Sequence, residues 1–268
     1  LFFFFFLIPG LITCKAALEA DSVHITATRP ETAPTSTVCP TKTATLTSSP
    51  NPTAPLPEST STVPDVPATR SALPICSPLG DHQRDELAEI VSQPYDPPAP
   101  NKDERHHGVD FAYYRHGGRA SIEGERVQAI LAGRVAAVIA DRPPYGNTVI
   151  LETRQNEIDP EIITALSMPA NSSLYHLYAH LQTTPNLRLH QEVACGQALG
   201  SVGQTGYLIP VPHLHLETRI GPPGARFESM AFYDTSASEE ERALYRLWRT
   251  SGRFQHVDPV LLFEAGSP

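Results

Sequence analysis

Apolar positions from about Gly108 to Ile220 recur in short alternating runs that are separated by Gly and Pro. A period of two between apolar positions predicts β-strands with one buried face. The segment from Val257 to Phe263 closes the domain. The pattern therefore predicts a mainly β domain, with strands in residues 127–139 (joined or bent at Gly133), 147–153, 174–181, 199–202 and 214–220.

Two shorter segments have the spacing of helices. In residues 84–92, Leu87, Ile90 and Val91 lie at helical spacing, and prolines from Pro94 onward end the segment. A short charged helix is predicted for residues 239–248, and its apolar side carries Ala243, Leu244, Leu247 and Trp248. We expect the charges of residues 239–242 to form a solvated face.

Residues 1–22 begin with an apolar run that has the length of a signal-peptide core and is short for a membrane span. The run ends in Leu11-Ile12-Thr13-Cys14, which resembles the lipobox of bacterial lipoproteins, where the Cys is lipidated after cleavage. An ordinary signal peptide and an uncleaved anchor are the alternatives. All three predict an extracytoplasmic protein, secreted or anchored at the bacterial cell envelope, whose membrane contact is limited to this segment.

Thr, Ser and Pro dominate the chain from about Arg29 to Pro74, and few large apolar residues occur there. Such a segment has too little apolar surface to offset the entropy cost of ordering its backbone. We therefore predict a disordered N-terminal stalk over residues 23–75, followed by a folded domain over residues 76–268.

The overall charge bears on possible partners, and the cysteines bear on disulfide formation. A formal net charge of −9 offers no general basic surface, and we expect no nucleic-acid partner. The cysteines show no C-x-x-C spacing for a metal or redox site. Because Cys76 and Cys195 both fall in the folded part, and the predicted compartment is oxidising, we hypothesise a disulfide between them.

Histidine is concentrated in three stretches that can hold a metal. In the first, His106 and Asp110 are four residues apart with Gly108 between them, so the loop can curl and bring both to one cation. The second stretch, residues 178–181, lies on a predicted strand. In the third, residues 213–217, alternate side chains share a face, so both histidines project to one side while Leu214 and Leu216 point into the core.

Two imidazoles and one carboxylate suit Zn²⁺ and leave one position of a tetrahedron for water or substrate. That open position distinguishes a catalytic zinc from a structural one. We expect one Zn²⁺ per domain, with an affinity that falls as the pH drops, because the imidazole nitrogens must be unprotonated to bind it.

These motifs together resemble peptidase family M23, the LytM/lysostaphin-type zinc metallopeptidases. The pattern of that family is H-x-x-x-D, then a Y-x-H-L strand, then H-x-H. The chain has His106-x-x-x-Asp110, Tyr178-Ala179-His180-Leu181 and His213-Leu214-His215 in the same order, with familial framework residues such as Gly203-Gln204-Thr205-Gly206. The resemblance covers roughly Arg105 to Ile220, plus Asp258-Pro259.

The resemblance implies an antiparallel two-sheet β domain of the duplicated hybrid motif type, with short helices. It implies His106, Asp110 and His215 as metal ligands, and His180 and His213 as catalytic residues beside the water that zinc activates. Which of these two is the general base stays open. Because the family cleaves peptide bridges of peptidoglycan, the expected function is that of a zinc metalloendopeptidase acting on cell-wall cross-links.

Two segments depart from the family pattern. Residues 207–212 (Tyr-Leu-Ile-Pro-Val-Pro) replace the usual approach to H-x-H, so the rim of the cleft is expected to differ. An insertion of about residues 221–256 separates the H-x-H strand from the closing segment, and it could cover one end of the groove.

A non-catalytic LytM-type module that binds cell wall or activates a partner amidase is the functional alternative. Degenerate relatives of that kind lack ligands, and because none is missing here, the enzyme is favoured. Among the remaining residues, His107 competes with His106, although the family register favours His106. His176 shares the predicted strand face of Tyr178 and His180 and is expected to border the cleft without binding metal. Glu217 could support a ligand histidine or lie at the rim.

Overall fold

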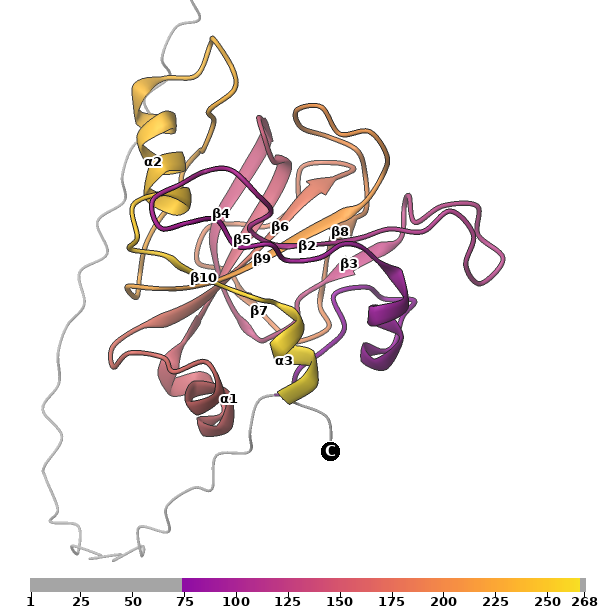
Figure 1. The fold of residues 1–268 in the computed structure, drawn as a ribbon, viewed down its shortest axis with the longest axis horizontal. Helices are drawn as coiled ribbons and strands as arrows, with labels where there is room; N and C mark the ends of the chain where they lie inside the picture. The colour runs from indigo at the N-terminus through magenta and orange to yellow at the C-terminus, as the bar shows by residue number, and fades with distance from the viewer. Residues whose placement is uncertain (1–73, 266–268) are drawn as a thin grey trace, which may run out of the picture. The chain divides into compact units, whose positions relative to one another are not determined.

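The structure is a computed structural model that describes residues 74–265 (Figure 1). The predicted signal segment, with Cys14, lies outside the described residues, and so does the predicted stalk except for residues 74–75. The proposed division of the chain at residues 22 and 75 therefore stays a prediction. No helix in residues 74–265 has the length and apolar character needed to cross a bilayer.

An antiparallel sheet of eight strands is the centre of the described domain (Figure 1). Its order is β1-β2-β9-β6-β5-β4-β7, and β10 also pairs with β9. The bounds are β1 Val91–Gln93, β2 Val109–Phe111, β4 Gly133–Arg142, β5 Gly146–Arg154, β6 Ser173–Leu181, β7 Glu192–Val193, β9 Leu214–Gly221 and β10 Gln255–Val257. A second sheet pairs β3 (Arg126–Gln128) with β8 (Ala198–Ser201). The predicted mainly β, antiparallel two-sheet fold is confirmed.

The helices are short, as expected. They are the 3₁₀ segments η1 (Arg84–Ile90) and η2 (Gln155–Glu157) and the α-helices α1 (Pro160–Ala165), α2 (Glu239–Arg249) and α3 (Val260–Ala265). The prediction of a helix through residue 92 was wrong at its end, because Val91 pairs with Phe111 as the first residue of β1. Leu87 and Ile90 are buried, as their spacing predicted.

Helix α2 begins at a capping box. The Ser238 hydroxyl accepts a hydrogen bond from the Glu241 N–H at 3.1 Å, and the Glu241 carboxylate accepts one from the Ser238 N–H at 2.8 Å. Two backbone donors that the helix leaves unpaired are thereby satisfied. The Glu241 carboxylate also pairs with Arg142 of β4, so the expectation of a solvated charge cluster was wrong for this residue.

The buried side of α2 differs in part from the predicted one. Tyr245 and Trp248 are buried, and Leu244 and Leu247 pack partly against them. Ala243 is exposed, so its assignment to the apolar side was wrong. Tyr245 belongs to the buried side of α2 instead, and its ring stacks on that of Phe232, with ring centroids 4.9 Å apart.

The two faces of the central sheet bury different side chains. On β9, Leu214, Leu216 and Ile220 join one hydrophobic cluster, while His215 and Glu217 project from the opposite face. This alternation confirms the predicted orientation of the leucines in the H-x-H stretch.

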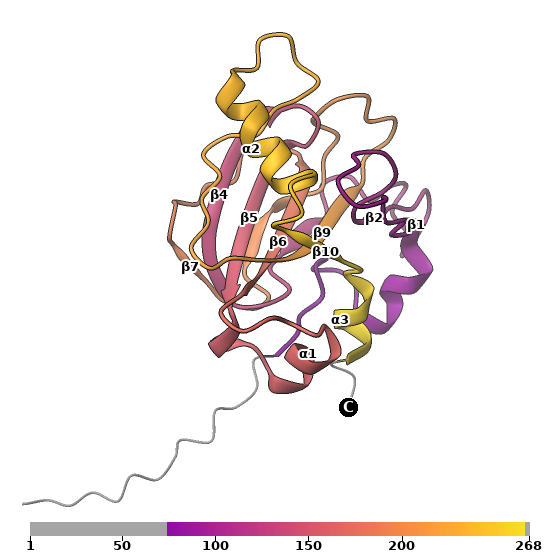
Figure 2. The ribbon, with the colours of Figure 1, turned by 60° about the vertical axis from the view of Figure 1, so that its left-hand side comes forward.

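The segment of residues 221–256 covers the face from which His215 projects. Its large side chains pack on apolar residues of β4, β5 and β6 in a second cluster, and α2 lies over these strands in Figure 2. The contributors from the segment are Phe227, Met230, Tyr245, Trp248 and Phe254. The insertion therefore folds onto the sheet next to the histidines instead of forming a separate unit.

A disulfide joins Cys76 to Cys195, which are 119 positions apart in sequence and have Cα atoms 5.8 Å apart. The hypothesis of this pairing is confirmed. The bond ties the first described residues to the turn that follows β7.

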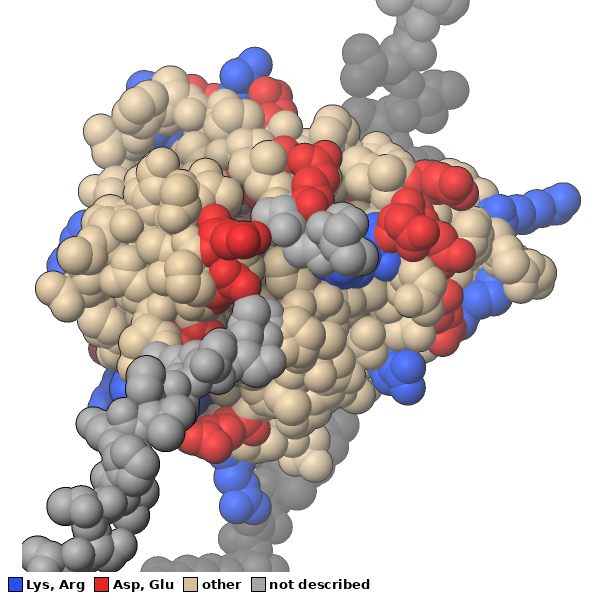
Figure 3. Space-filling view, turned by 90° about the horizontal axis from the view of Figure 1, so that it is seen from below, with Lys and Arg blue, Asp and Glu red and all other residues tan. Residues whose placement is uncertain are grey.

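Charged side chains are dispersed on the face of the domain drawn in Figure 3. Acidic side chains form several separate groups there, and basic ones lie mainly at the edges of the view. This face of the described residues therefore carries no extended basic surface.

Candidate metal centre

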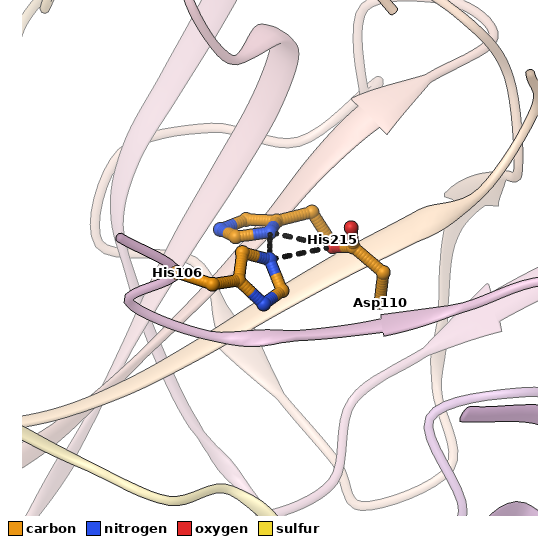
Figure 4. A group of neighbouring side chains, drawn as sticks. All are labelled: His106, Asp110 and His215. Atoms are coloured by element: carbon orange, nitrogen blue, oxygen red, sulfur yellow. Dashed lines mark hydrogen bonds and ion pairs between the residues drawn. The ribbon is translucent and has the colours of Figure 1, made fainter. Parts of the chain in front are cut away.

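Cross-strand register brings two of the predicted ligands together. Asp110 of β2 pairs directly with His215 of β9, and both side chains project from the same face. His106 lies in the loop before β2, where its backbone bridges to Asp96. Figure 4 shows the three side chains pointing toward one another. All are largely buried: the exposed fractions of the side chains are 11% for His106, 11% for Asp110 and 8% for His215.

The facing atoms form a small triangle. His106 Nε2 lies 3.0 Å from Asp110 Oδ1 and 3.1 Å from His215 Nδ1, and His215 Nδ1 lies 2.7 Å from Asp110 Oδ1. Zinc bonds of about 2.0–2.1 Å in a tetrahedron place ligand atoms about 3.3 Å apart. The triangle is thus close to the size that a zinc ion requires.

Hydrogen bonds on the outer side of each ring determine which nitrogen faces the triangle. His106 Nδ1 lies 2.8 Å from the Pro94 carbonyl, and His215 Nε2 lies 3.1 Å from Glu217 Oε1. In the neutral ring the N–H donates to that acceptor, so the lone pair of the other nitrogen points at Asp110. Two lone pairs and a carboxylate repel one another at this range unless a cation or proton lies between them. The donor set therefore fits a divalent metal.

The electrostatics of the cluster also favour positive charge. Burial raises the pKa of the Asp110 carboxyl, but its contacts with the His106 and His215 rings lower it more, so this pKa lies far below its usual range. Burial lowers the pKa of His215, whereas Asp110 and Glu217 raise it more, to about 9. Two ionised carboxylates thus flank a buried imidazole, and positive charge placed there is stabilised.

A β-bulge places His180 beside this cluster. Asn147 pairs with Leu181 and Val149 with Tyr178, so Ala179 and His180 together oppose one residue of β5. His180 has a left-handed backbone with φ of 61°, which is uncommon for a residue other than glycine. The extra residue turns the His180 ring from the core face to the site face. Its centroid lies 4.6 Å from that of His213 and 5.8 Å from that of His215.

The rings of His180 and His213 are oriented alike. His180 Nδ1 lies 2.8 Å from the Thr205 carbonyl, and His213 Nδ1 lies 2.9 Å from the Val211 carbonyl. Each Nδ1–H donates to its carbonyl, which places the lone pair of the ring on Nε2. Nε2 of His213 lies 3.7 Å from Asp110 Oδ2. Burial and the charges of His215 and His213 lower the pKa of His180 to about 3, so its ring is neutral at neutral pH.

The loop of residues 203–206 fixes His180 from behind. The Thr205 hydroxyl donates to the Leu181 carbonyl at 2.8 Å, and the Thr205 carbonyl accepts a hydrogen bond from His180 Nδ1. Gly206 has a φ of +109°, and a Cβ there would lie 2.3 Å from the Pro144 carbonyl oxygen and 3.1 Å from His180 Nδ1. A larger residue at position 206 would thus displace the loop from the imidazole.

Two other histidines lie away from the triangle. His107 is fully buried and its Nδ1 accepts from Arg219 Nη2 at 2.8 Å, so its ring faces away from Asp110. His176 was expected to border the cleft, and this was wrong. It lies on the opposite face of the sheet with no exposed surface, its Nδ1 is 3.1 Å from Thr218 Oγ1, and burial lowers its pKa to about 3. The bulge separates the orientations of His176 and His180.

Glu217 is a fully buried support of His215, not a rim carboxylate. Arg219 donates to its Oε2 through both Nε and Nη2, at 2.8 and 2.7 Å. Burial raises the pKa of Glu217, but Arg219, His215 and Arg249 together lower it more, and the carboxyl is ionised. The sequence motifs did not identify Arg249, and local spacing contains no signal for it, because it is distant from the histidines in sequence.

The residues of this site lie in a segment that is similar to known proteins. The sequence model of Peptidase family M23 matches residues 104–226. The match includes every residue of the three histidine motifs. The M23 resemblance is confirmed over this segment. The M23 segment thus carries the triangle, His180, His213 and Glu217, but α2 lies beyond it. None of the curated proteins compared matches the chain.

The solved structures to which this chain is similar include proteins of three bacteria. A mutant catalytic domain of the prophage-encoded M23 protein EnpA from Enterococcus faecalis is 21% identical, with 51% of this chain and 85% of that chain covered and a TM-score of 0.36. The catalytic domain of lysostaphin, an antimicrobial peptidase from Staphylococcus simulans, is 24% identical, with coverages of 52% and 86% and a TM-score of 0.36. A zinc-containing peptidase from Vibrio cholerae is 22% identical, with coverages of 48% and 33% and a TM-score of 0.33.

Proposed function

We propose that this chain is a zinc metalloendopeptidase that hydrolyses peptide cross-links of bacterial peptidoglycan outside the cytoplasm. The observation that carries the proposal is the triangle of His106 Nε2, Asp110 Oδ1 and His215 Nδ1, whose atoms lie 2.7 to 3.1 Å from one another. Two imidazoles whose Nδ1 atoms are hydrogen-bonded to backbone carbonyls lie beside it, at His180 and His213. The substrate class comes from the resemblance to family M23.

The residues present fit a Zn²⁺ ion, which would be held by His106, Asp110 and His215. A Zn²⁺ bound there supplies Lewis acidity, which lowers the pKa of a water molecule and polarises a peptide carbonyl. His180 or His213 accepts a proton at Nε2 from the attacking water and later donates it to the leaving amine. The other imidazole is placed to stabilise the carbonyl oxygen as it becomes negative.

The alternative of a non-catalytic cell-wall module requires a degenerate site. The M23 segment retains all three proposed ligands and both proposed catalytic histidines, with the outer ring nitrogens hydrogen-bonded. This completeness supports the enzyme over the module.

The test compares metal content and activity in the wild-type chain and in His215→Ala. We expect about one equivalent of Zn²⁺ in the wild type and release of new amino groups from purified sacculi. His215→Ala should lose both, because Asp110 and His106 alone leave the ion with too few protein ligands. His190→Asn is the matched control, since His190 is exposed and Asn tolerates its left-handed backbone. Zinc without amine release from the wild type would point to the non-catalytic module.

A further inference from the structure

The support of the metal site continues beyond the M23 segment into helix α2. We propose that Arg249 and Trp248, at the end of this helix, are positioning residues of the metal centre. The inference rests on the metal site of the proposed function and not on its substrate. It assigns to the insertion of residues 221–256 a part in holding the ligands, in addition to covering the sheet.

Glu217 is held at both carboxylate oxygens. Its Oε1 accepts from Tyr145 Oη at 2.5 Å, from His215 Nε2 at 3.1 Å and from Arg249 Nη1 at 3.2 Å. Its Oε2 accepts from Trp248 Nε1 at 2.9 Å, in addition to the fork of Arg219. A carboxylate has about four lone-pair positions. Glu217 therefore cannot rotate without breaking contacts, and the direction in which His215 Nε2 donates is fixed.

Arg249 connects Glu217 to the loop that carries His106. Its Nε donates to Asp103 Oδ1 at 2.7 Å, and its Nη2 donates to the Asp103 carbonyl at 3.1 Å. Asp103 lies three residues before His106, and Tyr245 Oη also donates to its carboxylate, at 2.9 Å. One guanidinium thus bridges the supports of two ligands that are 109 residues apart in sequence.

This bridge is buried. The Arg249 side chain is 11% exposed and Glu217 is not exposed at all. The Trp248 ring packs against the Arg219 guanidinium, whose carbon lies 4.8 Å from the ring centroid, and Trp248 itself is fully buried. The planar guanidinium of an arginine can donate to two acceptors at once in a fixed geometry, whereas the ammonium of a lysine has no such fixed geometry. Hydrogen-bond partners behind a ligand histidine typically contribute about 10–100-fold to metal affinity.

The test uses substitutions that preserve charge. Arg249→Lys keeps the positive charge near the site, so the electrostatic attraction for Zn²⁺ is retained while the two-sided fork is lost. Trp248→Phe keeps the ring packing and removes only the N–H that donates to Glu217. Arg142→Lys is the matched control. Arg142 also bridges two carboxylates of the insertion, Asp234 and Glu241, but neither of these supports a proposed metal ligand.

Zn²⁺ affinity is measured by competition with a chromogenic chelator, and the visible spectrum of the Co²⁺-substituted chain reports ligand geometry. We expect Arg249→Lys to weaken Zn²⁺ binding about 10–100-fold and to change the Co²⁺ spectrum. Trp248→Phe should weaken binding several-fold, and Arg142→Lys should leave it within about twofold of wild type. If Arg249→Lys does not fold, Trp248→Phe decides the question.

The proposal is overturned if Arg249→Lys and Trp248→Phe bind Zn²⁺ like the wild type, or if Arg142→Lys weakens binding as much as Arg249→Lys. A wild-type chain that binds Zn²⁺ and cleaves no peptidoglycan overturns the proposed function. In that case the Zn²⁺ affinities of Arg249→Lys and Trp248→Phe still decide this inference. A wild-type chain that binds no Zn²⁺ overturns both.

Discussion

Both faces of the central sheet bury apolar side chains from the same strands, and the face that carries His215, the site face, also buries the charged groups of the candidate metal centre. On β6, Leu174 and Tyr178 pack into the larger apolar cluster, while the opposite face presents Tyr175 and Leu177 to the insertion. On β9 the contrast is sharper, because the site face carries His215, Glu217 and Arg219, which are nearly or fully buried. The apolar face is stabilised by area removed from water. The site face is stable only if each buried charge has a partner.

This difference shows why the two faces depend on different parts of the chain. Strand alternation alone builds the apolar face, because any large apolar residue on the correct side contributes to it. The charged groups of the site face need partners at defined angles, and several of these come from residues 221–256. A change on the site face should therefore alter function, whereas one on the apolar face should alter stability only.

The largest expected effect comes from His180, compared with His176 on the same strand. His180→Asn should lower kcat by about 10²–10⁴-fold, because one of the two imidazoles proposed to transfer the proton or stabilise the oxyanion is lost. Zn²⁺ content should stay near that of the wild type, since His180 belongs to none of the triangle contacts. Asn tolerates the left-handed backbone at this position, so the bulge is preserved.

His176→Leu is the matched control on the opposite face. We expect kcat per folded molecule to be unchanged, because the His176 ring contacts Thr218 and no residue of the proposed site. Steady-state assays with titrated Zn²⁺ measure both variants. Equal loss of kcat in the two would contradict the separation of the faces.

A smaller effect, on stability alone, is expected at Leu174 of the apolar face. Leu174→Ala removes a fully buried side chain and should lower the free energy of unfolding by about 2–5 kcal/mol. Denaturant unfolding of the metal-free chain measures the loss. Zn²⁺ affinity of the folded variant should be unchanged, and a tenfold loss of affinity would mean that the two faces are coupled.

The smallest expected effect concerns the beginning of α2. Ser238→Ala removes the hydroxyl that accepts from the Glu241 N–H, and should cost about 1 kcal/mol of stability. Ser238→Asp retains an acceptor at the cap and should restore most of it. Thermal unfolding distinguishes the two variants. If Ser238→Ala unfolds at the same temperature as the wild type, the cap contributes nothing to the stability of the domain.

Much of this arrangement could be predicted from local pattern. Alternation located most of the strands, and the H-x-H spacing put Leu214 and Leu216 into the core. The bulge at His180 was not predictable, because it is a mismatch of register with β5 and leaves no mark on the spacing of β6 itself. For the same reason His176 was assigned to the wrong face.

The sequence by itself determined the mainly β architecture, the resemblance of residues 104–226 to Peptidase family M23 and the side chains that converge in the triangle, because these depend on spacing within short motifs. Only the tertiary structure decided which partners hold those side chains. Asp103, Glu217 and Arg249 come together through three separate segments, and nothing in the local pattern of one segment specifies the other two. Buried charges are satisfied by whichever donors the completed fold brings to them, so their partners are a property of the packing and not of any single motif.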